Sequence, residues 1–296
     1  MTVANGSPND NSFFTWNEFV EEFGAQLDGA QDVYLKMQKE GLKPNALLKF
    51  DVHFLCDDKI NADRLSTFIK DNYQYTIESV RKEDDKIWAV NGISYEFPVT
   101  SDNLMYWILD MYKRGYGFDC KLDGYGAPMD VKNQKFPDLS VDKVDYYFDL
   151  GVDRYNTGDL SGAIINWSNL IEINDKDASA YYSRAVVKDE LYTWKSALRD
   201  YDKAIELNPD FISALLNRGS LKDENEDFDG AIADYLSVIN NKKSDKGNLQ
   251  KAYFNKGNTY LELKQIKKAC GDWSKARELG ADYAQERISK YCTKNE

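Results

Sequence analysis

The sequence has little of what catalytic and metal sites are usually built from. It contains a single histidine, His53, in 296 residues. A metal ion therefore finds no second imidazole ligand. The four cysteines form no CxxC pair, so the usual spacing of a zinc site is also absent. No GxxxxGK[ST], GxGxxG or GxSxG motif occurs. The usual phosphate cradles and the nucleophile elbow are therefore excluded, and a catalytic triad around His53 has no nucleophile motif to support it.

Long apolar runs and an apolar leader are missing as well. No stretch approaches the roughly 20 apolar residues that span a bilayer, and the opening MTVANGSPNDNS is polar. We therefore expect a soluble, cytoplasmic protein without membrane contact, with a mobile N-terminus over residues 1–15. Cys270 and Cys292 should lie on neighbouring helices and could form a disulfide. In the cytoplasm, two buried thiols are the more common outcome.

The chain is acidic, with 50 Asp and Glu against 38 Lys and Arg and a formal net charge of −12. Such a surface repels phosphate backbones, so we expect no direct binding to nucleic acid. It favours basic protein partners instead. We interpret the acid pairs, such as Asp189/Glu190 and Asp223/Glu224, as solvated surface and not as a glycosidase pair or a calcium loop. The expectation is a protein without enzymatic activity, cofactor or metal.

One pattern recurs along the second half of the chain with a period of 34 residues, marked by Ala163, Ala197 and Ala231. Two helices approach closely only where a side chain is small, so the recurrence predicts stacked pairs of helices. The other small and aromatic positions that recur are Gly151, Ala185, Gly219 and Gly257, and Trp167, Tyr201, Tyr235 and Trp273.

We place four repeats after a linker over residues 128–143, and a capping helix over 281–292 that shields the last apolar face. The segment NKKSDKGNLQ carries four extra residues, which we expect to form a longer turn. The period and the small and aromatic sites resemble the tetratricopeptide repeat family. That resemblance implies protein binding in a concave groove lined by the first helix of each pair. The repeats are 144–177, 178–211, 212–245 and 250–283.

The groove positions of this chain are apolar and acidic. They suit a basic or aromatic segment of a partner protein better than a free carboxylate, and the alternative is that the N-terminal domain fills the groove. The candidate residues are Phe148, Val152, Tyr155, Tyr182, Val186, Asp189, Glu190, Leu216, Asp223, Glu224, Phe254 and Asn258.

Residues 16–127 mix helical and strand patterns. A leading helix is expected over WNEFVEEFGAQLDGAQDVYLKMQKEG, or two helices divided near Gly29, followed by a half-buried strand in LLKFDVHFLCD. A helix begins near Asn61, two strands flank the turn EDD, and a further helix is capped by Ser101 or Asp102. FDCKLDGYG supplies the last strand.

This β-α-β-β-α-β order predicts a ferredoxin-like α+β domain, followed by the all-α domain of tetratricopeptide type. Both helices should cover the same face of the sheet. Lys49, Asp51 and His53 should then lie on the open face.

The leading helix, KFDVHFL, NYQYTIESV, DDKIWAV and the closing DGYG resemble the family of regulator of ribonuclease E activity B. Asp123, Gly124, Tyr125 and Gly126 match its Asp-Gly-aromatic-Gly turn, with Tyr where Trp is common. The resemblance implies that the protein binds a ribonuclease and lowers its activity, without catalysing a reaction itself. The long acidic tail of that family is missing here. For the turn itself we favour a local structural role over a partner contact, with positive φ at the glycines and Asp bonded to backbone amides.

We therefore expect a non-enzymatic adaptor or inhibitor that covers the surface of a partner protein, with a ribonuclease as the candidate. Two alternatives stay open: an immunity protein that neutralises a nuclease-type toxin, and a general tetratricopeptide scaffold. An acidic surface complements the basic cleft of a nuclease in the first two cases, so charge does not separate them.

Overall fold

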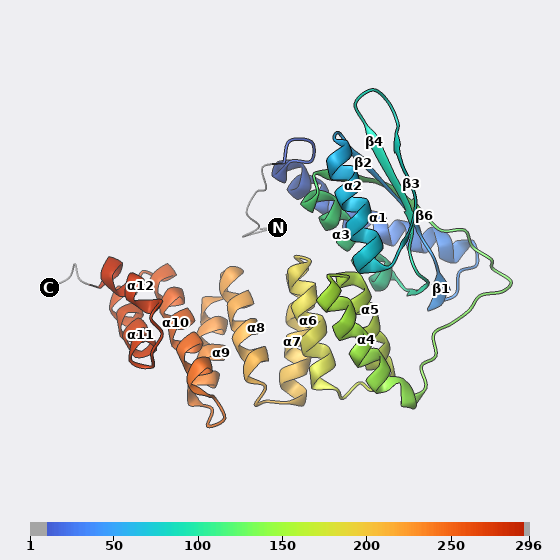
Figure 1. The fold of residues 1–296 in the computed structure, drawn as a ribbon. Helices are drawn as coiled ribbons and strands as arrows, with labels where there is room; N and C mark the ends of the chain where they lie inside the picture. Colours follow the sequence, from blue (N-terminus) through green and yellow to red (C-terminus); the bar gives the residue numbers. More distant parts are fainter. Residues whose placement is uncertain (1–10, 293–296) are drawn as a thin grey trace. The chain divides into compact units, whose positions relative to one another are not determined.

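The structure is a computed structural model that describes residues 11–292 (Figure 1). The chain divides between Asp175 and Lys176 into two compact units. The helices and strands, in chain order, are α1 (Trp16–Lys39), β1 (Ala46–Leu48), β2 (Asp51–Cys56), α2 (Lys59–Phe68), the π-helical turn η1 (Ile69–Tyr73), β3 (Thr76–Lys82), β4 (Trp88–Ile93), β5 (Phe97–Val99), α3 (Ser101–Gly117), β6 (Cys120–Gly126), the 3-10 turn η2 (Val141–Lys143), α4 (Val144–Thr157), α5 (Leu160–Ile173), α6 (Ala178–Glu190), α7 (Trp194–Leu207), α8 (Ile212–Glu224), α9 (Phe228–Asn240), α10 (Lys246–Glu262), α11 (Ile266–Glu278) and α12 (Ala284–Tyr291).

The first unit is built on a four-stranded antiparallel sheet in the order β3-β4-β2-β6. The two central strands are the first and third of the β-α-β-β-α-β set, which is the ferredoxin-like arrangement, so the predicted fold is confirmed. Helices α1, α2 and α3 contribute to one hydrophobic core with Val52, Phe54 and Cys56 of β2. These three residues are buried, and they alternate with half-exposed His53 and Leu55.

Local hydrogen bonds explain where the observed elements differ from the expected ones. The leading helix α1 is continuous through Gly29, and Thr15 and Glu18 close its start as a capping box. The expected long first strand is split into β1 and β2, because β1 pairs with β5 as a separate two-stranded sheet. Thr100 caps α3 instead of Ser101 or Asp102, since its side chain accepts from the backbone N–H of Asn103.

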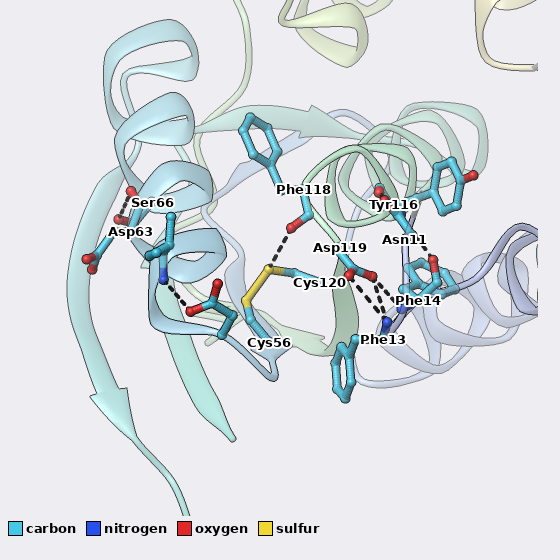
Figure 2. Close-up of a disulfide and its surroundings, with 12 residues drawn as sticks. Asn11, Phe13, Phe14, Cys56, Asp63, Ser66, Tyr116, Phe118, Asp119 and Cys120 are labelled. Carbon is cyan, nitrogen blue, oxygen red and sulfur yellow. Dashed lines mark hydrogen bonds between the residues drawn. A yellow bond between two sulfur atoms is a disulfide. The ribbon is translucent and has the colours of Figure 1, made fainter. Parts of the chain in front are cut away.

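A disulfide joins the two strands at one edge of the sheet (Figure 2). Cys56 of β2 and Cys120 of β6 lie opposite each other in the strand register, and both are fully buried. The adjacent Asp119 accepts hydrogen bonds from the backbone amides of residues 12–14, with 2.7 Å between its Oδ1 and the N of Phe14. Residues 12–14, assigned above to the mobile end, are instead held by this carboxylate, and Phe14 is fully buried. Residues 1–10 of that segment lie outside the described residues.

The remaining helices form the expected antiparallel pairs: α4 with α5 in the first unit, and α6 with α7, α8 with α9 and α10 with α11 in the second. Helix α12 packs on α11 as the predicted cap. The four extra residues lengthen α10 instead of forming a longer turn, because Asp245 caps that helix at Asn248 and starts it early. The expectation of two thiols at Cys270 and Cys292 is wrong, since a disulfide ties α11 to the end of α12.

Candidate partner-binding faces

The first helices of the pairs in the second unit pack side by side, α6 with α8 and α8 with α10. Most of the candidate residues on them are partly accessible, but Leu216 is buried in the core between pairs and is not available to a partner. We use the term first-helix face for the accessible positions. They are Tyr182, Val186, Asp189, Glu190, Ser220, Asp223, Glu224, Phe254, Asn258 and Glu262.

The aromatic and amide members of the first-helix face also hold the pairs together. The hydroxyl of Tyr182 accepts from Asn217 at 3.4 Å, which links α6 to α8. The ring of Phe254 meets Tyr283 edge-on at 4.8 Å. Asn258 accepts from the indole N–H of Trp273 at 3.2 Å. These three side chains are thus engaged in packing, and the acidic members give the face its distinct chemistry.

Acidic residues end all three of these helices. Asp189 and Glu190 close α6, Asp223 and Glu224 close α8, and Glu262 closes α10. The C-terminal end of a helix carries partial negative charge, so carboxylates there are unfavourable for the helix itself. The face therefore concentrates negative charge at the C-terminal end of each helix. Helix stability does not account for these acids, because it favours cations at that position.

The lysines beside these acids contact aspartates of the second helices. Lys188 contacts Asp200 at 2.8 Å, and Lys222 contacts Asp234 at 3.0 Å, both inside their helix pairs. Burial raises the pKa of Asp223, which Glu262 raises further while the Thr259 hydroxyl lowers it. A cation brought to Asp223 would therefore relieve an unfavourable charge.

A second pattern that recurs from pair to pair was missed by the sequence analysis. A cation on the first helix of a pair bonds a buried aspartate 16 residues later on the second helix. Its signal in the sequence is the recurring 16-residue spacing from a cation to an aspartate, which the small and aromatic positions do not reveal. The first pair carries Leu150 and Asn166 at these positions. The ion pairs are Arg184–Asp200, Arg218–Asp234 and Lys256–Asp272.

The candidates Phe148, Val152 and Tyr155 lie on α4, which belongs to the first unit. Phe148 and Val152 are half-buried, and Tyr155 is 37% exposed with its ring 6.5 Å from that of Trp167. The compact first unit thus includes the first helix pair as well as the sheet, although the sequence divides the chain before residue 144.

Two fully buried carboxylates explain why α4 and α5 pack with the α+β elements. Asp110 of α3 accepts from the Tyr73 hydroxyl at 2.8 Å and from the backbone N–H of Ser161 in α5 at 2.8 Å. Arg114 donates to the Tyr73 hydroxyl at 2.7 Å and also to the carbonyl of Gly158. Hydrogen bonds and charges from the α+β elements and from the first helix pair therefore meet around Asp110.

Asp159 is the second of these carboxylates and caps α5 at Gly162. It accepts from the Tyr95 hydroxyl at 2.8 Å and from Arg154 at 3.2 Å. Burial, followed by the nearby charge of Asp110, raises the pKa of Asp159 to about 7, against the opposing effect of Arg154. We call these two carboxylates and their partners the docking cluster.

The DGYG segment lies within strand β6 and not in a turn. Gly124 and Gly126 do not have positive φ, so the expected use of these glycines is wrong. A β-bulge opposite His53 and Phe54 leaves Asp123 exposed, where it approaches His53 at 3.5 Å. Tyr125 is half-buried and its ring meets that of Trp107 at 5.9 Å, which is a packing role.

A row of polar side chains crosses the open sheet face. His53 pairs with Asn91 at 2.6 Å, and Asn91 donates to the Ser79 hydroxyl at 3.0 Å. Asp51 is exposed on the same strand, and Lys49 lies between β1 and β2. The hydroxyl of Ser79 meets Asn91 and not the imidazole, so this row does not have the arrangement of a catalytic triad.

One cavity and two absences complete the description of residues 11–292. An open cavity of about 440 Å³ lies on α2 and η1, lined by Asp63, Arg64, Thr67, Phe68, Asp71, Asn72 and Phe118. Within the described range, no group of three or more His, Cys, Asp or Glu side chains could hold a metal ion. In the same range, no helix has both the length and the apolar character needed to cross a bilayer.

Comparison with known families supports both resemblances. Residues 27–127 match the family "Regulator of ribonuclease activity B". Residues 250–270, at the start of the last helix pair, match the tetratricopeptide repeat model. Both are families of regulators and adaptors that act by binding proteins. No curated protein matches the chain.

Several solved structures share the helical half. A crystal structure of MamA is 24% identical, with a TM-score of 0.43 over 50% of this chain and 81% of its own. PilF of Pseudomonas aeruginosa is 22% identical, with a TM-score of 0.43 over 48% of this chain and 64% of its own. The tetratricopeptide domain of Arabidopsis OM64 is 21% identical, with a TM-score of 0.35 over 40% of this chain and 95% of its own.

Proposed function

We propose that this chain is a non-catalytic regulator that binds a partner protein through the first-helix face and covers a basic surface of that partner. The observation that carries the proposal is the acidic end of each first helix, where carboxylates gather although the helix dipole disfavours them. A partner segment rich in Lys or Arg complements this negative charge.

A ribonuclease is the candidate partner. Support comes from the match of residues 27–127 to a family of ribonuclease regulators. Nucleases bind phosphate backbones and carry basic clefts for them, so an acidic regulator can cover such a cleft without chemistry of its own.

The test compares three forms of the full chain in the native cell by cross-linking and mass spectrometry. The first is the unchanged chain. The second neutralises the face with Asp189→Asn, Glu190→Gln, Asp223→Asn and Glu224→Gln. The third is a charge-matched control in α1 and its C-cap, with Glu21→Gln, Asp28→Asn, Asp32→Asn and Glu40→Gln, all at exposed positions.

The proposal expects a stoichiometric protein that is cross-linked to α6, α8 or α10, is retained by the control and is lost from the face variant. If that protein is a nuclease, adding the purified chain should lower its turnover of RNA. A partner retained equally by all three forms would overturn the role of the face. A partner that is a secreted nuclease-type toxin would instead support the immunity alternative.

A further inference from the structure

Charge is unevenly distributed along the helix stack. Residues 241–296 carry 13 Lys and Arg against 7 Asp and Glu, although the whole chain has a net charge of −12. Several of these cations contact a carboxylate of their own helix pair or of the cap. Four exposed lysines form no ion pair within the described residues, and they gather at one end of the last pair. We call them the basic tip: Lys264, Lys267, Lys268 and Lys290.

The basic tip is assembled from two parts of the chain. Its first three lysines lie in the connection between α10 and α11 and in the first turn of α11. The disulfide between Cys270 and Cys292 holds the end of α12 beside the start of α11, which adds Lys290. Cations are unfavourable at the positive end of a helix. The stability of α11 therefore does not account for the lysines that begin it.

The corresponding end of the preceding pair is acidic. Glu226 lies in the connection between α8 and α9, Asp227 caps α9 by accepting from the backbone N–H of Gly230 at 3.1 Å, and Asp229 follows in the first turn. We call these three acids the acidic tip. All three are exposed. In the part of the chain that the structure describes, none of them forms an ion pair.

The two tips occupy the same position in successive helix pairs. Glu226 and Lys264 both have a left-handed backbone, with φ of 64° and 58°. Asp229 and Lys267 are the second residues of α9 and α11. Helices α8 and α10 pack side by side, and each is followed by an antiparallel partner, so both connections lie at the same end of the stack (Figure 1). Side chains of opposite charge therefore stand at matching places on neighbouring pairs.

We propose that the two tips bind a second copy of this chain. A two-fold axis that passes between the tips places the acidic tip of one copy against the basic tip of the other, and the same axis forms the reverse contact. Neighbouring patches of opposite charge are complementary to themselves in this arrangement. An RNA backbone would be attracted by the basic tip but repelled by the acidic tip beside it. The dimer goes beyond the proposed function, because neither tip contains a residue substituted in the test of the first-helix face.

The dimer is held by exposed charges, so it is weak and sensitive to salt. Single exposed ion pairs contribute little, but the two-fold axis forms each of them twice. The net charge of −12 on each copy opposes association. At physiological ionic strength, charges more than about 8 Å apart are largely screened. The facing tips therefore decide whether two copies associate.

Sedimentation of the full chain over a range of concentrations tests the proposal with two variants. One carries Glu226→Lys and Asp229→Lys, and the other carries Lys264→Glu, Lys267→Glu and Lys268→Glu. In each variant both tips have the same sign of charge, so the dissociation constant of its homodimer should rise at least about 10-fold. An equimolar mixture of the two variants should associate again, because every tip then meets one of opposite charge.

Two matched controls change the same charges elsewhere, at exposed positions. They should dimerise as the unchanged chain does. The first carries Glu21→Lys and Asp28→Lys in α1. The second carries Lys242→Glu, Lys246→Glu and Lys251→Glu, at the other end of the last pair.

The mixture separates a lost contact from a lost fold, because only folded variants can restore the dimer. A chain that stays monomeric at every concentration would overturn the proposal. So would a dimer that neither variant weakens, or a mixture that fails to associate although both variants melt like the unchanged chain. If the monomer binds a labelled RNA and the lysine variant does not, the basic tip serves nucleic acid and the dimer is wrong.

Discussion

The Tyr95 hydroxyl donates a 2.8 Å hydrogen bond to Oδ2 of Asp159, and this contact ties the segment between β4 and β5 to the start of α5. The guanidinium of Arg154 lies 4.2 Å from the centre of the Tyr95 ring and bonds the same carboxylate at 3.2 Å. Asp159 is thus placed between an arginine and a phenol with no exposure to water. Its titration should report on the packing of the first helix pair.

We predict that the first unit loses stability as the pH rises from about 4 to about 7. The pKa of Asp159 is raised from 3.8 to about 7, so the folded state holds its proton more tightly than the unfolded state. The contribution is therefore fully present below the unfolded pKa and is lost as the pH passes through the folded value. Its upper limit is about 4 kcal/mol. Hydrogen exchange of α5 at pH 4.5 and 7.5 measures it.

The substitution Asp159→Asn should flatten this pH dependence, because the amide keeps an acceptor for Tyr95 but does not titrate. Asp145→Asn, an exposed acid on α4, is the matched control and should leave the dependence unchanged. An unaltered pH slope in Asp159→Asn would contradict the role given to Asp159.

Repeating local patterns made much of the fold predictable. The small residue of each first helix and the aromatic residue of the second recur in register, and at Gly219 and Tyr235 the structure shows why, since the ring fills the space that a Cβ would need. The ferredoxin-like order followed from the alternation in β2 and from the helical stripes. Each of these signals lies within one element or one repeat.

The docking cluster could not be predicted in the same way. Asp110 lies in α3 and Asp159 at the start of α5, and no local spacing relates them. Each looks like an ordinary acid in its own helix, and only the packing buries both. Asp189, Glu190, Asp223 and Glu224 of the first-helix face were named from the sequence, and Glu262 was not. The contacts of Lys188 and Lys222 with aspartates of the second helices follow from the packing of each pair.

Breaking a buried ion pair of the helix stack should lower the unfolding free energy more than breaking an exposed one. Asp234 is 3% exposed and holds both Arg218 and Lys222, so Asp234→Asn leaves two cations short of a partner. We expect a loss of about 3 kcal/mol in unfolding free energy, at the low end for a broken buried pair because both cations keep some water. Urea unfolding of the full chain measures it. Asp202→Asn removes a 60% exposed partner of the same Arg218 and should cost less than about 1 kcal/mol.

Glycine should be required at position 219, where α8 packs on Tyr235, and dispensable at position 271. Gly219→Ala would place a methyl group 2.8 Å from the Tyr235 ring, and overpacking of this kind costs about 1–3 kcal/mol. Gly271 lies on the exposed side of α11 with nothing within 4 Å of an added Cβ. Gly271→Ala should therefore raise the unfolding free energy by up to about 1 kcal/mol, because alanine has the higher helix propensity. The melting temperature should rise accordingly. Equal effects at the two sites would contradict close packing at Gly219.

The disulfide between Cys270 and Cys292 should hold the capping helix in place. Helix α12 has eight residues and is too short to be stable alone, so its order depends on α11 and on this covalent link. Replacing both cysteines by alanine opens a loop with a sequence separation of 22, for which chain entropy predicts a loss of about 3 kcal/mol. Hydrogen exchange of α12 should accelerate while that of α6 stays unchanged. Replacing Cys56 and Cys120 by alanine should instead loosen β6. If all four cysteines of the unreduced protein react with an alkylating reagent, both disulfides are contradicted.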